Sequence, residues 1–314
     1  SSPATRAAQL LADTDDAARE LSRWLVRASW MERAIPWHIL LRALRAPEFD
    51  GLAKPARRWA RVAHALRGLG FERDLDHRLR AEPAPFAYAP RAHVLPLDAP
   101  GDVRVLQSAL DFGLAADVYA AQAVGEGLAL TLVSPALATL LRWPLGPSVA
   151  SALGTAFMQL RADASFLRRF EGLEGPWLER AARHAALVVL FEARAQAACV
   201  VVEDAPARGE QERARQLAAA LERALGVQLP PGLAALWAYA AAPGGATFDA
   251  FQTGLAVHVG LRERLDADWY RNPRVADVLR GAAARGNTLD LAELRKELNV
   301  SASAGSQRLL ELLE

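Results

Sequence analysis

The sequence contains one cysteine and almost no lysine, and each scarcity narrows what the chain can do. Because Cys199 is the only cysteine, the chain can form neither an internal disulfide nor a zinc site built from cysteines. Its neighbours in residues 197–201 are apolar, which predicts a small buried side chain. Lys54 and Lys296 are the only lysines. Together with abundant alanine, this preference for arginine indicates a GC-rich bacterial genome rather than a function.

Long apolar runs and an excess of one charge are also missing. No stretch of about 18 uninterrupted apolar residues occurs, which argues against a membrane span. The 37 basic and 36 acidic residues give a formal net charge of +1, so we expect no nucleic-acid or membrane partner. Residues 1–6 do not form a signal peptide, which favours a cytoplasmic protein, and native sequence could precede Ser1.

The sequence is rich in apolar residues that recur at helical spacing. The apolar fraction of 52% with 23% charged residues is typical of a globular chain, and 314 residues suffice for a sizeable core. The first helical pattern begins near Leu10 and continues to Leu25. Further helices are expected over residues 36–44, 55–69, 116–140, 147–161, 176–202, 210–225, 231–242, 246–265, 273–285 and 290–298.

Residues 82–104 interrupt this helical pattern. Closely spaced prolines between Glu82 and Pro90 exclude a regular helix. Residues 93–97 and 103–106 predict two short strands joined by a turn. We therefore expect a mainly α, multi-helix fold with a small β-sheet near residues 84–106.

Residues 124–130 resemble the zinc-binding helix of the gluzincin metallopeptidases, but they lack its metal ligands and its general base. In the oligopeptidase-like (M3-type) branch of that family the segment reads His-Glu-x-Gly-His-Ala-Leu. Val124 and Leu128 stand at the two zinc-binding histidines, and Gly125 stands at the general-base glutamate. The residues that match the family pattern are Gly127, Ala129 and Leu130.

The resemblance continues along the chain. Residues 145–152 are similar to the family's second zinc helix, whose glutamate ligand falls on Ser151. Weaker similarities, in the same order as in the family, occur over residues 97–105, 117–121, 163–169 and 265–274. The resemblance implies a zincin-like (M3-type) helical bundle, organised as an N-terminal helical subdomain over 1–81, a degenerate metallopeptidase-like domain over 82–298 and a C-terminal tail over 299–314.

The residues at the ligand positions determine whether this fold can bind zinc and hydrolyse peptides. Two histidines four residues apart share a helix face, and a carboxylate from a second helix completes a zinc site with an open position for water. The zinc-bound water, with its pKa lowered to about 7, attacks the peptide bond. Aliphatic and hydroxyl side chains supply none of this, so the resemblance implies no metal, no cofactor and no peptidase chemistry. A shifted alignment on residues 109–114, with Asp111 at the base position, also lacks the histidines.

Four further residues are candidates for the wall of a former substrate cleft: Glu126, Phe248, Phe251 and His258. Family enzymes stabilise the oxyanion with a late tyrosine or histidine, and the two phenylalanines carry no hydroxyl for this. The helical position of Glu126 favours a solvated or capping role over base catalysis. A single histidine on an apolar helix is more often a core residue than a ligand, which favours the core for His258.

Other constellations offer weaker sites. The six histidines include no His-x-x-x-His pair. His184 and Glu192 share a face of one expected helix, but a metal there needs a further ligand. Residues 57–61 mix arginine with tryptophan, and the acidic residues that follow them favour a solvated helix face over a phosphate site.

We therefore expect a catalytically inactive metallopeptidase homologue that acts in peptide or protein binding, regulation or assembly. Two alternatives stay open at this point. One is an enzyme of non-zinc chemistry built from dispersed residues, namely Asp111, His184, Glu192 and His258. The other is a purely structural subunit of a larger complex, which would expose a large apolar patch.

Overall fold

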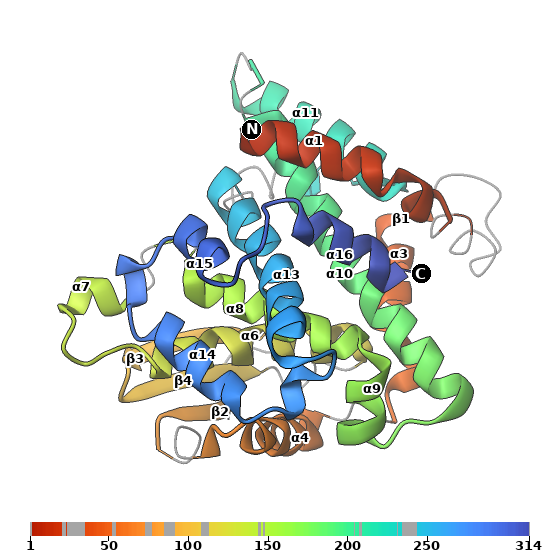
Figure 1. Cartoon of the computed structure of the whole chain (residues 1–314). Helices are drawn as coiled ribbons and strands as arrows, with labels where there is room; N and C mark the ends of the chain where they lie inside the picture. Colours follow the sequence, from red (N-terminus) through yellow and green to blue (C-terminus); the bar gives the residue numbers. More distant parts are fainter. Residues whose placement is uncertain are drawn as a thin grey trace. The chain divides into compact units, whose positions relative to one another are not determined.

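The structure is a computed structural model, and it is mainly helical with a small sheet, as the sequence predicts (Figure 1). Its chain divides into two compact units. Unit 1 comprises Ser1–Leu44, Leu187–Asp249 and Leu313–Glu314, and unit 2 comprises Arg45–Ala186 and Ala250–Leu312. The residues that it describes are 2–20, 23, 35–51, 55–72, 77–84, 92–107, 113–143, 146, 148–203, 205–206, 209–230, 232–233 and 244–313.

These units differ from the expected division of the chain. The expected boundaries after residues 81 and 298 both fall inside unit 2. Helices α10 (Gly175–Glu203) and α13 (Gly245–Leu265) each contribute several residues to both units. Each unit therefore combines segments that are distant in the sequence, which composition and linker signals do not reveal.

Unit 1 contains the first helix and the segments that follow the middle of α10. Its elements are α1 (Pro3–Asp13), β1 (Ile35–Pro36), α3 (Trp37–Arg45), α11 (Glu210–Leu225) and β5 (Val227–Gln228). Helix α1 begins earlier than the periodicity near Leu10 suggests, because Ser2 caps it: the Ser2 hydroxyl accepts from the Thr5 amide at 3.1 Å. The two-residue strands β1 and β5 pair in parallel and were not predicted.

One buried arginine holds helix ends together in unit 1. The side chain of Arg194 on α10 is 4% exposed. It donates to the Ala224 carbonyl near the end of α11 at 2.6 Å and to the Leu11 carbonyl near the end of α1 at 2.9 Å. It also donates to the Thr14 hydroxyl at 2.7 Å. The guanidinium thereby satisfies carbonyl groups that helix ends leave without intrahelical partners.

The three-stranded sheet lies in unit 2. Its strands are β2 (Leu79–Pro83), β3 (His93–Asp98) and β4 (Asp102–Gln107), in the order β2-β4-β3. Strand β4 pairs in parallel with β2 and antiparallel with β3. The two predicted strands are confirmed as β3 and β4, whereas β2 begins before the expected start of the sheet and was missed.

The helices of unit 2 follow the predicted order closely. The predicted helix over 116–140 is too long: it ends at Thr131, whose hydroxyl donates to the Leu128 carbonyl at 2.7 Å, and Pro135 follows. The predicted helix over 231–242 lies almost wholly outside the described residues. The helices present are α4 (Pro55–Gly68), α6 (Leu114–Thr131), α7 (Thr139–Arg142), α8 (Val149–Met158), α9 (Ala164–Phe166), α14 (Arg274–Ala283), α15 (Leu291–Glu297) and α16 (Ala304–Leu313).

Short turns of tighter or wider helix connect these elements: η1 (Pro47–Phe49), η2 (Gln159–Ala162), η3 (Leu167–Glu171), η4 (Trp269–Arg271) and η5 (Gly286–Thr288). The expected tail over 299–314 contains α16, which packs closely on α13. A β-carbon at Gly305 would lie 2.5 Å from the Gln252 carbonyl oxygen, so this contact depends on glycine.

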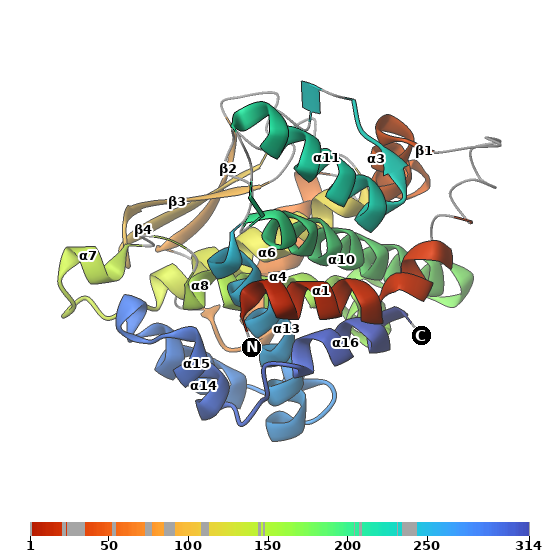
Figure 2. The same cartoon turned by 90° about the horizontal axis from the view of Figure 1, so that it is seen from above.

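Helix α6 is the centre of unit 2. It lies between the sheet and α8 (Figures 1 and 2). On the sheet side, a β-carbon at Gly127 would lie 2.9 Å from Leu79 Cδ1 and 3.3 Å from Val105 Cγ2. Because both sides are covered, α6 is apolar around most of its circumference.

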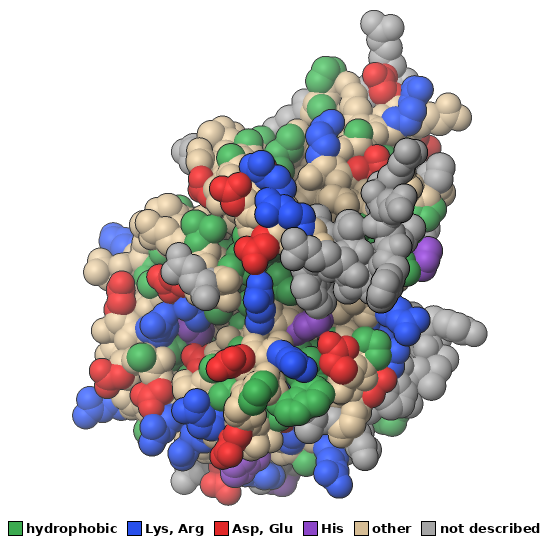
Figure 3. All heavy atoms as spheres, turned by 90° about the vertical axis from the view of Figure 1, so that its right-hand side faces the viewer, with side chains coloured by type: hydrophobic (Ala, Val, Ile, Leu, Met, Phe, Trp, Pro, Cys, Tyr) green, Lys and Arg blue, Asp and Glu red, His purple; other side chains and the backbone are tan. Residues whose placement is uncertain are grey.

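Helix α10 is long and apolar enough to cross a membrane, and it is the one helix of the described chain that passes this test. However, 89% of its most apolar window is buried inside the protein. A buried core helix meets the same criterion, so this feature is weak support for a span. On the face shown in Figure 3, acidic and basic side chains are interspersed, in keeping with the formal net charge of +1.

Candidate functional site

The two helices that resemble the zinc helices of gluzincins, α6 and α8, pack directly on each other. Two glycines make this close contact possible. A β-carbon at Gly125 would lie 2.8 Å from Phe157 Cβ and 2.9 Å from the Leu153 carbonyl oxygen. A β-carbon at Gly154 would lie 2.7 Å from the Gln122 carbonyl oxygen. Glycine at these two positions therefore allows α6 and α8 to pack closely, and a larger residue would clash with the facing helix.

Two of the three residues at the expected ligand positions are buried in this helix contact. Val124 is 0% exposed and Leu128 is 1% exposed, while Ser151 at the third position is partly exposed. None of the three offers an imidazole, thiolate or carboxylate, and one hydroxyl does not hold zinc. These residues do not fit the zinc ion that the gluzincins bind between the corresponding helices. Within the described ranges, no group of three or more His, Cys, Asp or Glu side chains could hold a metal ion.

Gly125 is the residue that the sequence resemblance aligns with the general base. A larger residue there would need a β-carbon, and Phe157 and Leu153 of α8 fill that space. The α6–α8 contact therefore leaves no room for a side chain at position 125.

Glu126 lies next to this position and differs from the expectation. It lies well inside α6, so it cannot cap the helix, and it is only partly exposed. Burial raises the pKa of its carboxyl group. Glu126 Cβ would lie 3.2 Å from a β-carbon placed at Gly154, which puts this residue at the edge of the α6–α8 contact rather than on a solvated face.

A buried charge network fixes the first turn of α6, and no local sequence pattern indicates it. Asp117 of α6 accepts from Arg58 Nε, from Arg61 Nη2 at 3.2 Å and from Arg161 Nη2 at 3.1 Å. Glu171 pairs with Arg61 at 2.9 Å and with Arg161 at 2.5 Å. Asp117 is 4% exposed and Arg58 is 2% exposed. This network joins α4, α6, η2 and η3.

The network corrects the expectation for residues 57–61. The sequence favoured a solvated helix face there, but Arg58 is buried and paired with a carboxylate 59 residues further along the chain. A pair of such long sequence separation leaves no local spacing pattern. The acidic partner is Asp117 rather than the nearby acidic residues that follow α4.

Three of the four expected cleft residues lie in the core. Phe248 is 0% exposed, Phe251 is 2% exposed and His258 is 0% exposed. His258 packs edge-to-face on Trp269, with ring centroids 5.6 Å apart. The structure therefore places these side chains in apolar packing rather than on the wall of a cleft. None of them lines the cavity of unit 2 that is described below.

The His258 imidazole is kept neutral by its surroundings. Burial lowers its pKa well below the ordinary value, and the positive charges of Arg308 and Arg262 lower it further. The backbone of Ala156 favours the protonated form but does not offset the burial. Within the described chain, neither ring nitrogen makes a hydrogen bond of normal geometry.

The dispersed residues considered for a different chemistry have separate surroundings. In unit 2, the His184 ring packs on Phe49 with centroids 6.1 Å apart. In unit 1, Glu192 accepts from the Gln196 amide at 2.9 Å. Asp111 lies outside the described residues.

Cys199 is also unsuited to nucleophilic chemistry. It is 3% exposed, and burial raises the pKa of its thiol to about 12, with Glu192 and Glu203 acting in the same direction. The thiol therefore stays protonated near neutral pH, which makes it a poor nucleophile. This agrees with the small buried side chain that the sequence predicts.

Comparison with known proteins identifies the fold. No protein-family model and no curated protein matches the sequence. The crystal structure of an M32 carboxypeptidase from Deinococcus radiodurans R1 matches with a TM-score of 0.59 and 16% sequence identity. The match covers 98% of this chain and 67% of that chain. The sequence resemblance pointed to the M3-type branch, and this structural relative is of the M32 type. The chain has a mainly helical, metallopeptidase-like fold similar to that of an M32 carboxypeptidase.

Proposed function

We propose that this chain is a catalytically inactive metallopeptidase homologue that serves in peptide or protein binding, regulation or assembly. The observation that carries this proposal is the glycine-mediated contact between α6 and α8. The space that a general-base side chain at Gly125 would need is filled by Phe157 and Leu153. The metallopeptidase-like fold supports common ancestry with metallopeptidases. The α6–α8 contact supports the loss of peptide hydrolysis.

Hydrolysis by a zinc peptidase needs three features that this helix pair lacks. It needs ligands for the ion, a base for the bound water and an open path for water to the ion. Val124 and Leu128 are aliphatic and buried, and position 125 has no side chain. With all three features missing at the same place, one substitution cannot restore the reaction.

The surface of unit 2 supports a binding role. Helix α7 lies beside the β3–β4 turn, where Arg142 Nη1 donates to the Ala99 carbonyl at 3.0 Å. Strand β3 lies at an edge of the described sheet. Large apolar side chains are exposed on these two elements and at Trp143, which directly follows α7. Exposed apolar groups beside a sheet edge are typical of surfaces that bind other chains. The exposed side chains are Leu95, Leu97, Leu140, Leu141 and Trp143.

Peptide hydrolysis tests the catalytic half of the proposal. Purified protein, supplied with zinc, should not cleave quenched fluorogenic peptides of varied sequence, and an active zinc carboxypeptidase should cleave its substrate in the same buffer. Turnover that follows the protein through purification and disappears with a chelator would contradict the proposal.

Peptide display tests the binding half. A library of unstructured peptides should enrich apolar sequences on the native protein. The double variant Leu95→Asp/Leu97→Asp should lose this enrichment, because charges on the exposed apolar face are costly to cover. Equal enrichment on both proteins would exclude this surface as the binding site.

A further inference from the structure

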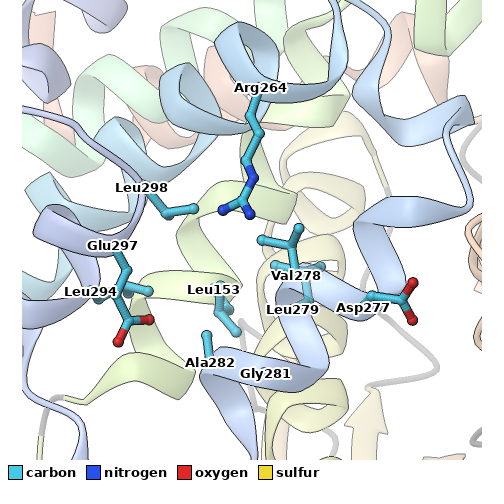
Figure 4. A pocket seen from close by; sticks show the side chains of 10 residues that line it. All are labelled: Leu153, Arg264, Asp277, Val278, Leu279, Gly281, Ala282, Leu294, Glu297 and Leu298. Atoms are coloured by element: carbon cyan, nitrogen blue, oxygen red, sulfur yellow. The ribbon is translucent and has the colours of Figure 1, made fainter.

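A cavity of about 230 Å³ lies in unit 2 between α8, α13, α14 and α15 (Figure 4). It is smaller than the roughly 300–1,000 Å³ of pockets that hold drug-sized ligands. A ligand that fills it is therefore a compact small molecule.

The inner wall of the cavity is apolar. Leu153 of α8 and Leu279 of α14 are each 2% exposed, and Leu294 of α15 is 1% exposed. Ala282 and Leu298 extend this wall. A ligand that covers these side chains gains from the removal of apolar surface from water, which favours an aliphatic or aromatic tail over a polar one.

Arg264 supplies the charge in the cavity. Arg264 is an exposed residue whose guanidinium group points toward the cavity, which is partly open to solvent (Figure 4). It makes no hydrogen bond or ion pair within the described residues. Asp277 points away from the cavity, and its side chain is 83% exposed. The Glu297 carboxylate is paired with Arg285, which also holds Glu293 at 2.8 Å. Arg264 is therefore the lining charge that is left for a ligand.

We propose that this cavity binds a small monocarboxylate with a compact aliphatic or aromatic tail. A guanidinium group matches the two oxygens of a carboxylate with two parallel hydrogen bonds. The tail then lies on the apolar wall formed by Leu153, Leu279 and Leu294. The vestigial positions 124, 125, 128 and 151 do not line this cavity, so the proposal stands or fails separately from the proposed function.

Calorimetric titration of the full chain with 4-methylpentanoate tests whether binding needs the negative charge of the ligand. The acid should bind, and 4-methylpentanamide, which has nearly the same shape without the charge, should bind at least about tenfold more weakly. Arg264→Gln should lower the affinity for the acid by a similar factor. Arg271→Gln, which removes an exposed arginine paired with Asp268 outside the cavity, should leave it unchanged.

Gly281 provides a second test that does not alter charge. It lines the cavity, and a β-carbon there would meet nothing within 4 Å, so larger side chains fit without unfolding α14. Gly281→Phe should occlude the cavity and abolish binding, while Gly281→Ala should retain it. Absence of binding by the native chain, equal binding of acid and amide, or native affinity in both Arg264→Gln and Gly281→Phe would each overturn the proposal.

Discussion

The backbone of Gly125 in α6 lies so close to Phe157 in α8 that a β-carbon on residue 125 would come within 2.8 Å of Phe157 Cβ. Position 125 is the one that the sequence resemblance aligns with the general base of the gluzincins. The same helix contact gives unit 2 a tightly packed centre and leaves no room for a side chain at this position.

Gly125→Ala should destabilise the protein by about 1–3 kcal/mol, since added atoms in a filled contact force the helices apart. Chemical denaturation followed by circular dichroism measures this. Gly281→Ala is the matched control, because it adds the same methyl group to a helix in open space. The control should be neutral or more stable by roughly 0.5–1 kcal/mol through helix propensity. Equal stability of both variants would show that the α6–α8 contact can yield.

Glu126→Gln should stabilise the protein at neutral and alkaline pH. Burial raises the folded-state pKa above the ordinary value of 4.5, so the stability linked to this group is complete below pH 4.5 and is lost as pH rises through the folded-state pKa. The glutamine variant keeps a neutral side chain and avoids this loss. Melting temperatures across the acidic to alkaline range should show an advantage of the variant that grows with pH. An advantage that is constant with pH, or absent, would contradict a buried carboxyl group.

Asp117→Asn should weaken unit 2 strongly. The substitution removes the carboxylate that pairs with Arg58, Arg61 and Arg161. Breaking a buried ion pair on one side typically costs about 3–5 kcal/mol. Asp277→Asn, on an 83% exposed side chain, is the control and should change the free energy of unfolding by less than about 0.5 kcal/mol. Similar small effects for both would mean that the network is not structurally important.

His258 should make the protein sensitive to mild acid. Its folded-state pKa lies well below the ordinary value of 6.5, so the unfolded chain binds the proton first as pH falls. The free energy of unfolding should therefore decrease as pH drops below 6.5. His258→Leu should reduce this slope, whatever its effect on absolute stability, and His93→Gln at an exposed position should not. A native slope in His258→Leu would assign the acid sensitivity to other groups.

Much of the fold is predictable from local sequence patterns. Apolar spacing located most helices, and alternation with flanking turns located β3 and β4. The end of α6 at Thr131 was missed because this helix is apolar on nearly every side, so its hydrophobic pattern does not change where the helix stops. Strand β2 was missed because Leu79–Pro83 is short and its burial pattern only partly alternates.

The geometry of the candidate site is not predictable from the sequence. The assignment of positions 124, 125, 128 and 151 rests on the resemblance alone and stays a prediction. The close approach of Phe157 to Gly125, the pairing of Arg58 with Asp117 and the opening of the cavity beside Arg264 each join segments far apart in the chain. Such contacts depend on how helices pack, which local spacing does not encode.

Zinc stoichiometry tests the central claim most directly. Protein equilibrated with zinc, desalted and analysed by inductively coupled plasma mass spectrometry should retain no stoichiometric metal. Val124→Ala/Leu128→Ala should give the same value as the native chain. One tightly held zinc ion per native chain would contradict the account.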